Sequence, residues 1–369
     1  MDGQLARRDP LFADLLDKFV CVRLVQCYGL DRKLFQFDSN LTMAIFFMNA
    51  DGKLYGRFGT RASHDDGEYV DPKGLRASMV GALGLHSAVR SGLSNPRTLL
   101  ADKQRLDSPW DRFEHLPAMK DRVAPVSRDK HKCYHCHWIQ GGEILSRRSE
   151  GLPVEDRHLW SYPLLDTLGA SLDPATKATV ARVDPDSPAA EAGLQPGDEI
   201  TAMEGQPILS IADVQWVLHH AKDGTTISLT AHRPTAPTPR RLEVSLPSGW
   251  RRKGDISWRA IKWMLRDEVL GFQMEPLGER QKRKHRLPTD RPAYVVSRLM
   301  PAWYKEANHA PEKAGLRKGD IVVAINGSPP PDSMSRLLAW IAQETRPGDR
   351  TELRVIRDGK RKTIVFRLK

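Results

Sequence analysis

The chain has 369 residues, a formal net charge of +11 and a pI near 9.5. Its hydrophobic fraction of 40% and charged fraction of 28% are typical of globular domains and argue against a disordered or fibrous chain. The length predicts two to three domains, four cysteines are too few for a disulfide scaffold, and no apolar run reaches the length of a membrane helix.

The first 93 residues predict a small α/β domain. Residues 9–18 predict a short helix, and residues 19–25, 42–48 and 54–58 predict strands, with a tight hairpin turn between the last two. Residues 75–89 predict an amphipathic helix. Cys21 and Cys27 flank the first predicted strand, and we expect both to be buried as small hydrophobic residues.

This order of elements resembles the C-terminal part of a thioredoxin fold, and residues 46–57 carry most of the resemblance. No Cys-x-x-Cys precedes the first helix, and no proline stands before Met43, where thioredoxins have one. The resemblance therefore implies a partial thioredoxin-like domain without its redox-active half. Residues 1–8 show no apolar signal-peptide region, which predicts a cytoplasmic chain if Met1 is the natural start.

Residues 94–165 predict a linker with an irregular or helical module that carries Cys133-Tyr134-His135-Cys136-His137. This Cys-x-x-Cys-His spacing suits covalent haem, with Cys133 and Cys136 bonded to the vinyl groups and His137 as an iron ligand. A second iron ligand would come from His131, His158 or Met203. Haem c is therefore the leading interpretation of the segment, although its attachment in bacteria takes place outside the cytoplasm.

Three other interpretations of the same segment remain open. Zinc could be held by Cys133 and Cys136 together with His131, His135 or His137. The two cysteines could instead form a thiol–disulfide couple, with nearby Lys132 and histidines lowering the thiol pKa. Finally, both cysteines could be chemically inert.

The C-terminal half contains an internal repeat. Residues 192–200 read Ala-Gly-Leu-Gln-Pro-Gly-Asp-Glu-Ile, and residues 314–322 read Ala-Gly-Leu-Arg-Lys-Gly-Asp-Ile-Val. We expect Gly193 and Gly315 to end a short helix, and Asp198 and Asp320 to accept hydrogen bonds from backbone amides. The repeat resembles PDZ domains of the bacterial high-temperature-requirement protease type, which implies two β-barrel or sandwich domains at 166–250 and 251–369.

A PDZ domain holds a peptide carboxylate in a glycine-containing loop and adds the peptide to a strand edge beside a helix. The candidate carboxylate loops are Leu168-Gly169-Ala170 in the first copy and Leu270-Gly271-Phe272 in the second. Residues 213–218 and 335–341 predict the groove helices. We expect Trp216 and Trp340 on them to pack in the core, and the basic run 279–286 to be a solvated loop.

Taken together, a thioredoxin-like front, Cys-x-x-Cys-His and two PDZ-like repeats resemble a family of planctomycete-like bacterial proteins, some described as selenoproteins. The resemblance is carried further by residues 159–163 and 254–259, and it implies export to the envelope. The leading functional hypothesis is a non-proteolytic scaffold that binds polypeptide C-termini or extended peptides and carries a redox or haem centre. The alternatives are a thiol–disulfide oxidoreductase and a regulatory partner of an envelope protease. The basic charge favours acidic surfaces, but no nucleic-acid motif accompanies it, so we expect no nucleic-acid ligand.

Overall fold

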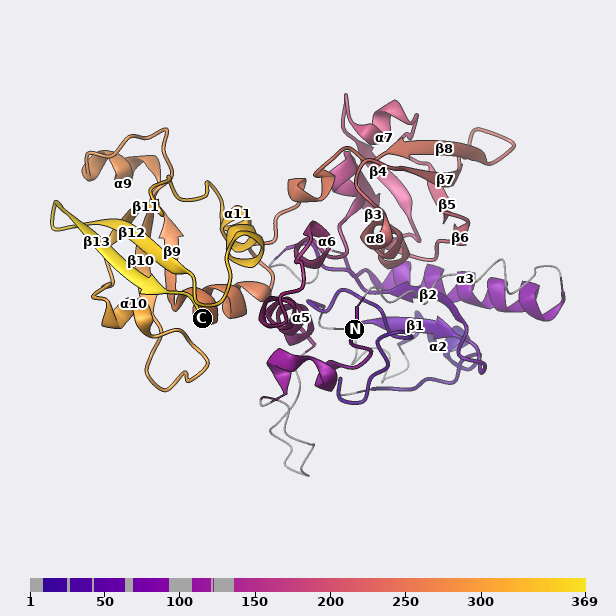
Figure 1. Ribbon diagram of the computed structural model, residues 1–369. Helices are drawn as coiled ribbons and strands as arrows, with labels where there is room; N and C mark the ends of the chain where they lie inside the picture. The colour runs from indigo at the N-terminus through magenta and orange to yellow at the C-terminus, as the bar shows by residue number, and fades with distance from the viewer. Residues whose placement is uncertain are drawn as a thin grey trace. The chain divides into compact units, whose positions relative to one another are not determined.

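A computed structural model describes residues 9–24, 27–41, 43–63, 69–92, 108–120, 122 and 136–369 (Figure 1). They divide into two compact units. The first unit contains the described residues up to His115, Cys136 and Trp160–Gly254, and the second contains those of Leu116–Arg122, His137–Leu159 and Asp255–Lys369. The protein is mixed α/β, with one large antiparallel sheet in each unit.

The N-terminal layer of the first unit is a hairpin covered by a helix. Its elements are α2 (Ala13–Leu16), β1 (Ile45–Met48), β2 (Leu54–Phe58) and α3 (Pro72–Arg90). The strands pair in antiparallel register with Phe47 opposite Gly56. The side chain of Asp71 accepts from the Lys73 N–H and caps α3, with Pro72 in the first turn. The predicted hairpin and long helix are therefore confirmed.

The predicted strand at residues 19–25 is wrong over the described residues 19–24, while Val25 lies outside the described residues. Residues 19–24 belong to no strand, and Val20 and Val22 are 94% and 78% exposed. Cys21 is also exposed, contrary to expectation, whereas Cys27 is half-buried. Among the described residues β1 pairs with β2 alone, so the segment has no strand that could take up its backbone hydrogen bonds.

The large sheet of the first unit has the strand order β3-β4-β5-β7-β8, with the short β6 paired to β5. Its elements are η3 (Leu165–Leu168), β3 (Ala170–Asp173), β4 (Thr179–Val183), α7 (Pro188–Glu191), β5 (Glu199–Met203), β6 (Gln206–Pro207), α8 (Ile211–His220), β7 (Thr226–His232), β8 (Arg240–Ser245) and η4 (Trp250–Lys253). Figure 1 shows α8 between this sheet and the β1–β2 hairpin. Leu168, Ile200, Val214, Leu218 and Leu229 are among the residues of its core.

The second unit repeats this plan with the strand order β13-β12-β11-β10-β9. The helices and strands of this sheet domain are η5 (Trp263–Leu270), β9 (Phe272–Pro276), α9 (Glu279–Lys284), β10 (Tyr294–Leu299), α10 (Ala310–Lys313), β11 (Ile321–Ile325), α11 (Met334–Ala339), η6 (Trp340–Glu344), β12 (Arg350–Arg357) and β13 (Lys360–Arg367). The elements η2 (Pro117–Met119), α5 (Trp138–Ser149) and α6 (Asp156–Leu159) also belong to this unit, whereas η1 (Phe113–His115) belongs to the first. No helix in the described part of the chain is long and apolar enough to cross a membrane.

The two repeats share a buried aspartate that organises the turn before β5 or β11. Asp198 accepts from the Gln195 N–H at 2.9 Å, as expected from the sequence, and also from Arg233 at 2.7 and 2.9 Å. Asp320 accepts from the Arg317 N–H at 2.9 Å in the same way. Arg357 forms two hydrogen bonds of 2.6 Å with Asp320. The arginines, which the repeat motif did not reveal, give each aspartate a charged partner in addition to the backbone amide.

Candidate functional site

Each predicted carboxylate loop ends a short helix and leads directly into the outer strand of its sheet. Gly169 follows η3 with φ 84° and Gly271 follows η5 with φ 85°, both in the left-handed region. β3 and β9 begin at the next residue, and within the described part of the chain each is the last strand of its sheet. This geometry suits strand addition, because the outer edge of such a strand carries backbone groups that point away from the sheet.

Both loop glycines are held in close contact with a residue on a neighbouring segment. A Cβ on Gly169 would lie 2.2 Å from Cβ of Ser187, and a Cβ on Gly271 would lie 1.8 Å from the carbonyl oxygen of Asn308. Asn308 also donates to the carbonyl of Val269 at 2.9 Å. A side chain at position 169 or 271 would therefore clash with its neighbour and strain the left-handed backbone. The sequence signals the glycines but not their partners.

The side chains of the loops pack inward. Leu168 and Leu270 are 0% and 1% exposed, and Ala170 and Phe272 are 2% and 1% exposed. Of the predicted peptide-binding residues, therefore, the glycines and the backbone amides are the parts that can meet a ligand, while the flanking side chains fix the loop to the core.

The charged side chains before the second loop are paired within the unit. Asp267 accepts from Arg266 at 3.0 Å and from Gln273 on β9 at 3.0 Å. Glu268 accepts from Arg122 at 2.7 Å and from the Tyr304 hydroxyl at 2.9 Å. Burial, together with the adjacent Glu268 carboxylate, raises the pKa of Tyr304, so its hydroxyl stays protonated and donates. Recognition of a peptide carboxylate at this loop would thus depend on backbone N–H groups.

The groove helix of the first domain is buried on its outer side as well as on its core side. Asp213 accepts from the Arg57 N–H at 3.1 Å, and the indole of Trp216 donates to Gln36 at 2.7 Å. The guanidinium of Arg57 lies 4.7 Å from the centre of the Trp216 ring. Trp216 is 4% exposed, as the core-packing prediction required, whereas Trp340 in the second domain is only half-buried.

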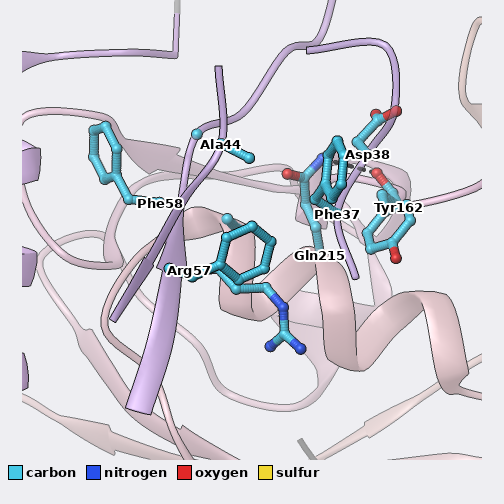
Figure 2. Close-up of a pocket in the computed structure, with 10 residues that line it drawn as sticks. Phe37, Asp38, Ala44, Arg57, Phe58, Tyr162 and Gln215 are labelled. Atoms are coloured by element: carbon cyan, nitrogen blue, oxygen red, sulfur yellow. Dashed lines mark hydrogen bonds between the residues drawn. The ribbon is translucent and has the colours of Figure 1, made fainter. Parts of the chain in front are cut away.

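A small cavity lies between the N-terminal layer and α8. Phe37, Phe58, Ala212 and Gln215 are among the residues that line it, together with Tyr162. Figure 2 shows Tyr162 and Gln215 near Phe37 on one side of the cavity and Phe58 on the other. Its volume of about 10 Å³ is the space of roughly one water molecule, so it cannot admit the side chain of a ligand.

The C-termini of both groove helices are capped by a buried arginine. Arg251 donates to the carbonyls of Leu218 at 2.9 Å and His219 at 3.1 Å at the end of α8. Arg148, on α5, donates to the carbonyl of Thr345 at 2.7 Å and to that of Ile341 in η6. Burial lowers the pKa of Arg148 to about 10, and the Asp349 carboxylate opposes that shift. Cationic groups at these ends also complement the helix dipole.

The Cys-x-x-Cys-His segment is only partly described. Cys133 and the candidate ligands His131 and His135 lie outside the described residues. Cys136 is half-buried, and its thiol donates to the carbonyl of Leu41 at 3.3 Å. His137 precedes α5, and its ring makes an edge-to-face contact with Trp263 at 6.2 Å.

Cys136 has an unexpected neighbour. Its side chain forms a hydrogen bond with the thiol of Cys27, and this bond, together with burial, raises the pKa of Cys27. Neither cysteine is in a disulfide. The sequence pointed to Cys133 as the partner of Cys136 and to Cys27 as an isolated residue, because 27 and 136 are far apart in the chain.

The other described ligand candidates each have a defined place within their own unit. Met203 is fully buried in the core of the first sheet domain, and Nδ1 of His158 accepts from the Glu155 N–H at 2.8 Å. Within the described residues no group of three or more His, Cys, Asp or Glu side chains is arranged to hold a metal ion.

Comparison with known proteins identifies the two sheet domains. The family model described as "PDZ domain" matches residues 154–246 and 269–368, which together make up more than half of the chain. A probable periplasmic serine endoprotease DegP-like of Pseudomonas savastanoi is 30% identical over 200 residues, covering 53% of this chain and 38% of that protein. The corresponding protein of Halomonas elongata is 27% identical over 216 residues, covering 56% of this chain and 40% of that protein. The chain thus spans about two fifths of the length of these relatives.

Similarity to solved structures is local. The serine endoprotease from Yersinia pestis is 27% identical over 19% of this chain and 25% of its own, with a TM-score of 0.18. The HtrA-type protease AlgW with decapeptide is 14% identical over 38% of this chain and 44% of its own, with a TM-score of 0.23.

Proposed function

Because the chain belongs to the PDZ domain family, we propose that it binds polypeptides, taking the C-terminal end or an extended stretch of another chain at the loops of its two domains. The observation that carries this proposal is the repeated geometry of Gly169 and Gly271. In both domains a left-handed glycine leads straight into a strand that is the outermost of its sheet among the described residues.

The proposed role is non-proteolytic. In one form of this proposal, the chain acts as a regulatory partner of an envelope protease. The relatives are named as serine endoproteases, but their names apply to much longer proteins. The order of β1, β2 and α3 supports a thioredoxin-like origin for the N-terminal layer as part of the same proposal.

A titration tests the binding role. Fluorescein-labelled decapeptides with a free apolar C-terminus would be titrated into the full chain and followed by fluorescence anisotropy, with C-terminally amidated peptides as the control. We expect saturable binding that is weakened by amidation, since the loop amides would bind the carboxylate. Binding that is equal for both forms would argue against recognition of C-termini.

We also propose thiol redox chemistry for the Cys-x-x-Cys-His segment, because a specific contact favours it. The thiols of Cys27 and Cys136 are hydrogen-bonded to each other, and Cys136 also donates to Leu41. Covalent haem would require the sulfur of Cys136 to leave both partners. Haem and zinc remain alternatives, and each has its own test. Haem would give a Soret band in protein matured outside the cytoplasm, and zinc would be found as one equivalent of tightly held metal.

The redox step balances with an oxidising disulfide as the electron acceptor. Each of the thiols Cys27 and Cys136 loses a proton, the two sulfurs give up two electrons as the S–S bond forms, and the acceptor is reduced to two thiols. Peptide mapping after oxidation with glutathione disulfide should recover a Cys27–Cys136 cross-link. A cross-link that joins only Cys133 and Cys136 would instead support a conventional Cys-x-x-Cys couple.

A further inference from the structure

In the first PDZ domain, the segment just before the carboxylate loop lies on the groove helix. The ring of Tyr162 stacks on that of His219 with the centroids 4.3 Å apart and an angle of 11° between the planes. The amide of Gln215 donates to the carbonyl of Tyr162 at 2.8 Å. The hydroxyl of Thr60 in the N-terminal layer donates to the side-chain oxygen of Gln215 at 3.0 Å. Tyr162 is thus bound to the helix through both its ring and its backbone.

The helix face that Tyr162 covers is not the face that packs into the core. Val214 and Leu218 belong to the core of the domain and are 0% exposed. Gln215 and His219 each follow one of these residues and are four residues apart, so they share a neighbouring face. Tyr162 already occupies that face, which lies beside the core face of the helix predicted to form the groove wall.

The second PDZ domain shows the same relationship with different chemistry. In the first turn of α11, the hydroxyl of Ser335 donates to Asp255 at 2.6 Å and accepts from the Ile256 N–H at 3.0 Å. Ile256 is 2% exposed. Further along the segment, Lys262 lies within electrostatic reach of Glu275 on β9, and burial together with Arg266 lowers the pKa of Lys262. Asp255 and Ile256 therefore contact the first turn of the groove helix, and Lys262 carries a charge that interacts with Glu275 of the outer strand.

We propose that residues 161–163 and 255–262 are built-in occupants of the two PDZ grooves and that a peptide binds by displacing them. This inference rests on the proposed peptide-binding function and adds its regulation. Since β2 and Thr60 also hold α8 and Gln215, the first groove is the more firmly closed of the two. The second groove, whose occupant is fastened to α11 through Ser335, is the one from which a ligand can displace it.

Occupancy of this kind lowers the apparent affinity for a ligand, because only molecules whose groove is open can bind. The apparent affinity equals the intrinsic affinity multiplied by the fraction of molecules with an open groove. Removing the hydrogen bonds at Ser335 would raise that fraction. Two hydrogen bonds of ordinary strength correspond to a change of about tenfold in the population of the open groove.

The test uses the full chain and the labelled decapeptides with a free apolar C-terminus described above. Ser335→Ala and Asp255→Ala each loosen the segment, and having two variants guards against a fold defect in one of them. Arg336→Ala is the matched control, since Arg336 is the next residue of α11, is exposed and forms an ion pair with Asp332. Hydrogen–deuterium exchange of residues 255–262 reports whether the segment has opened.

The inference predicts that Ser335→Ala binds about tenfold more tightly than the unaltered chain and that Asp255→Ala, which removes one of the two hydrogen bonds, binds more tightly by a smaller factor. Both variants should show faster exchange over 255–262, and Arg336→Ala should change neither measurement. Equal binding by the unaltered chain and all variants would overturn self-occupancy while leaving peptide binding intact. If the segment exchanges faster in the variants but no peptide binds to any of them, the segment opens without exposing a binding site, and the proposed function itself fails.

Discussion

Gly271 and the backbone of Asn308 touch so closely that a Cβ on the glycine would lie 1.8 Å from the Asn308 carbonyl oxygen. This contact joins the carboxylate loop to the segment before α10 (Ala310–Lys313), and it allows only glycine at a position whose φ is 85°. The shape of the loop is therefore set by the fold before any ligand arrives.

Gly271→Ala should destabilise the second domain by about 2–4 kcal/mol, from left-handed backbone strain and from overpacking against Asn308. Denaturant unfolding of the full chain measures the change. Gly278→Ala is the matched control, because Gly278 has φ −69° and the nearest atom to its added Cβ lies at 3.9 Å. Equal stability of the two variants would contradict the packing described for the loop.

Asp198 should give the first domain a pH-dependent stability. Burial raises the pKa of Asp198, but the hydrogen bonds from Arg233 and the Gln195 N–H outweigh it and leave that pKa below its usual value. The stabilisation is then complete above the unfolded pKa of ~3.9 and is lost as the pH falls through the lower folded value.

Asp198→Asn should accordingly lower stability by about 1–3 kcal/mol at pH 7 and flatten the fall in stability below the unfolded pKa of ~3.9. Urea unfolding at several pH values reads both effects. Asp186→Asn, at an exposed position in the same domain, serves as the control. A pH profile that stays as steep in Asp198→Asn as in the unaltered chain would show that another group is responsible.

Arg148→Met should cost the second unit about 2–4 kcal/mol, because it removes a charged donor from the buried carbonyls of Ile341 and Thr345 while nearly keeping the volume. Arg346→Met, at an exposed position one residue after Thr345, should change stability by less than about 0.5 kcal/mol. Thermal unfolding of the two variants gives the comparison. A loss no greater than that of the control would mean that water replaces Arg148 as the cap.

Oxidation should stabilise the chain if Cys27 and Cys136 form a disulfide. The bond would close a loop of roughly 110 residues, for which chain entropy predicts about 4–5 kcal/mol. Melting curves with and without dithiothreitol should differ in the unaltered chain and coincide in Cys27→Ser. The same shift in Cys27→Ser would assign the effect to another cysteine.

Sequence patterns predicted the elements that are determined by interactions between residues close together in the chain. The loops around Gly169 and Gly271, the hairpin of β1 (Ile45–Met48) and β2 (Leu54–Phe58), and α3 (Pro72–Arg90) all depend on turn residues and short-range periodicity. The partners of these elements depend on the tertiary fold.

Tyr162 and Ser335 show why the rest could not be predicted. Their contacts join a segment to a helix more than 50 residues away along the chain, and neither residue type marks such a contact in the sequence. The pairing of Cys27 with Cys136 is of the same kind. At residues 19–25 the apolar pattern indicated a strand, but a strand needs a neighbour, and the described residues supply none.

The outer positions of β3 (Ala170–Asp173) and β9 (Phe272–Pro276) also affect self-association of the protein. A bare strand edge that accepts a peptide accepts an identical edge equally well, which is how sheet proteins come to aggregate. If residues 161–163 and 255–262 occupy the space beside these edges, as proposed above, they would also hinder such pairing until a ligand arrives. Greater affinity for peptides and a greater tendency to self-associate should therefore increase together.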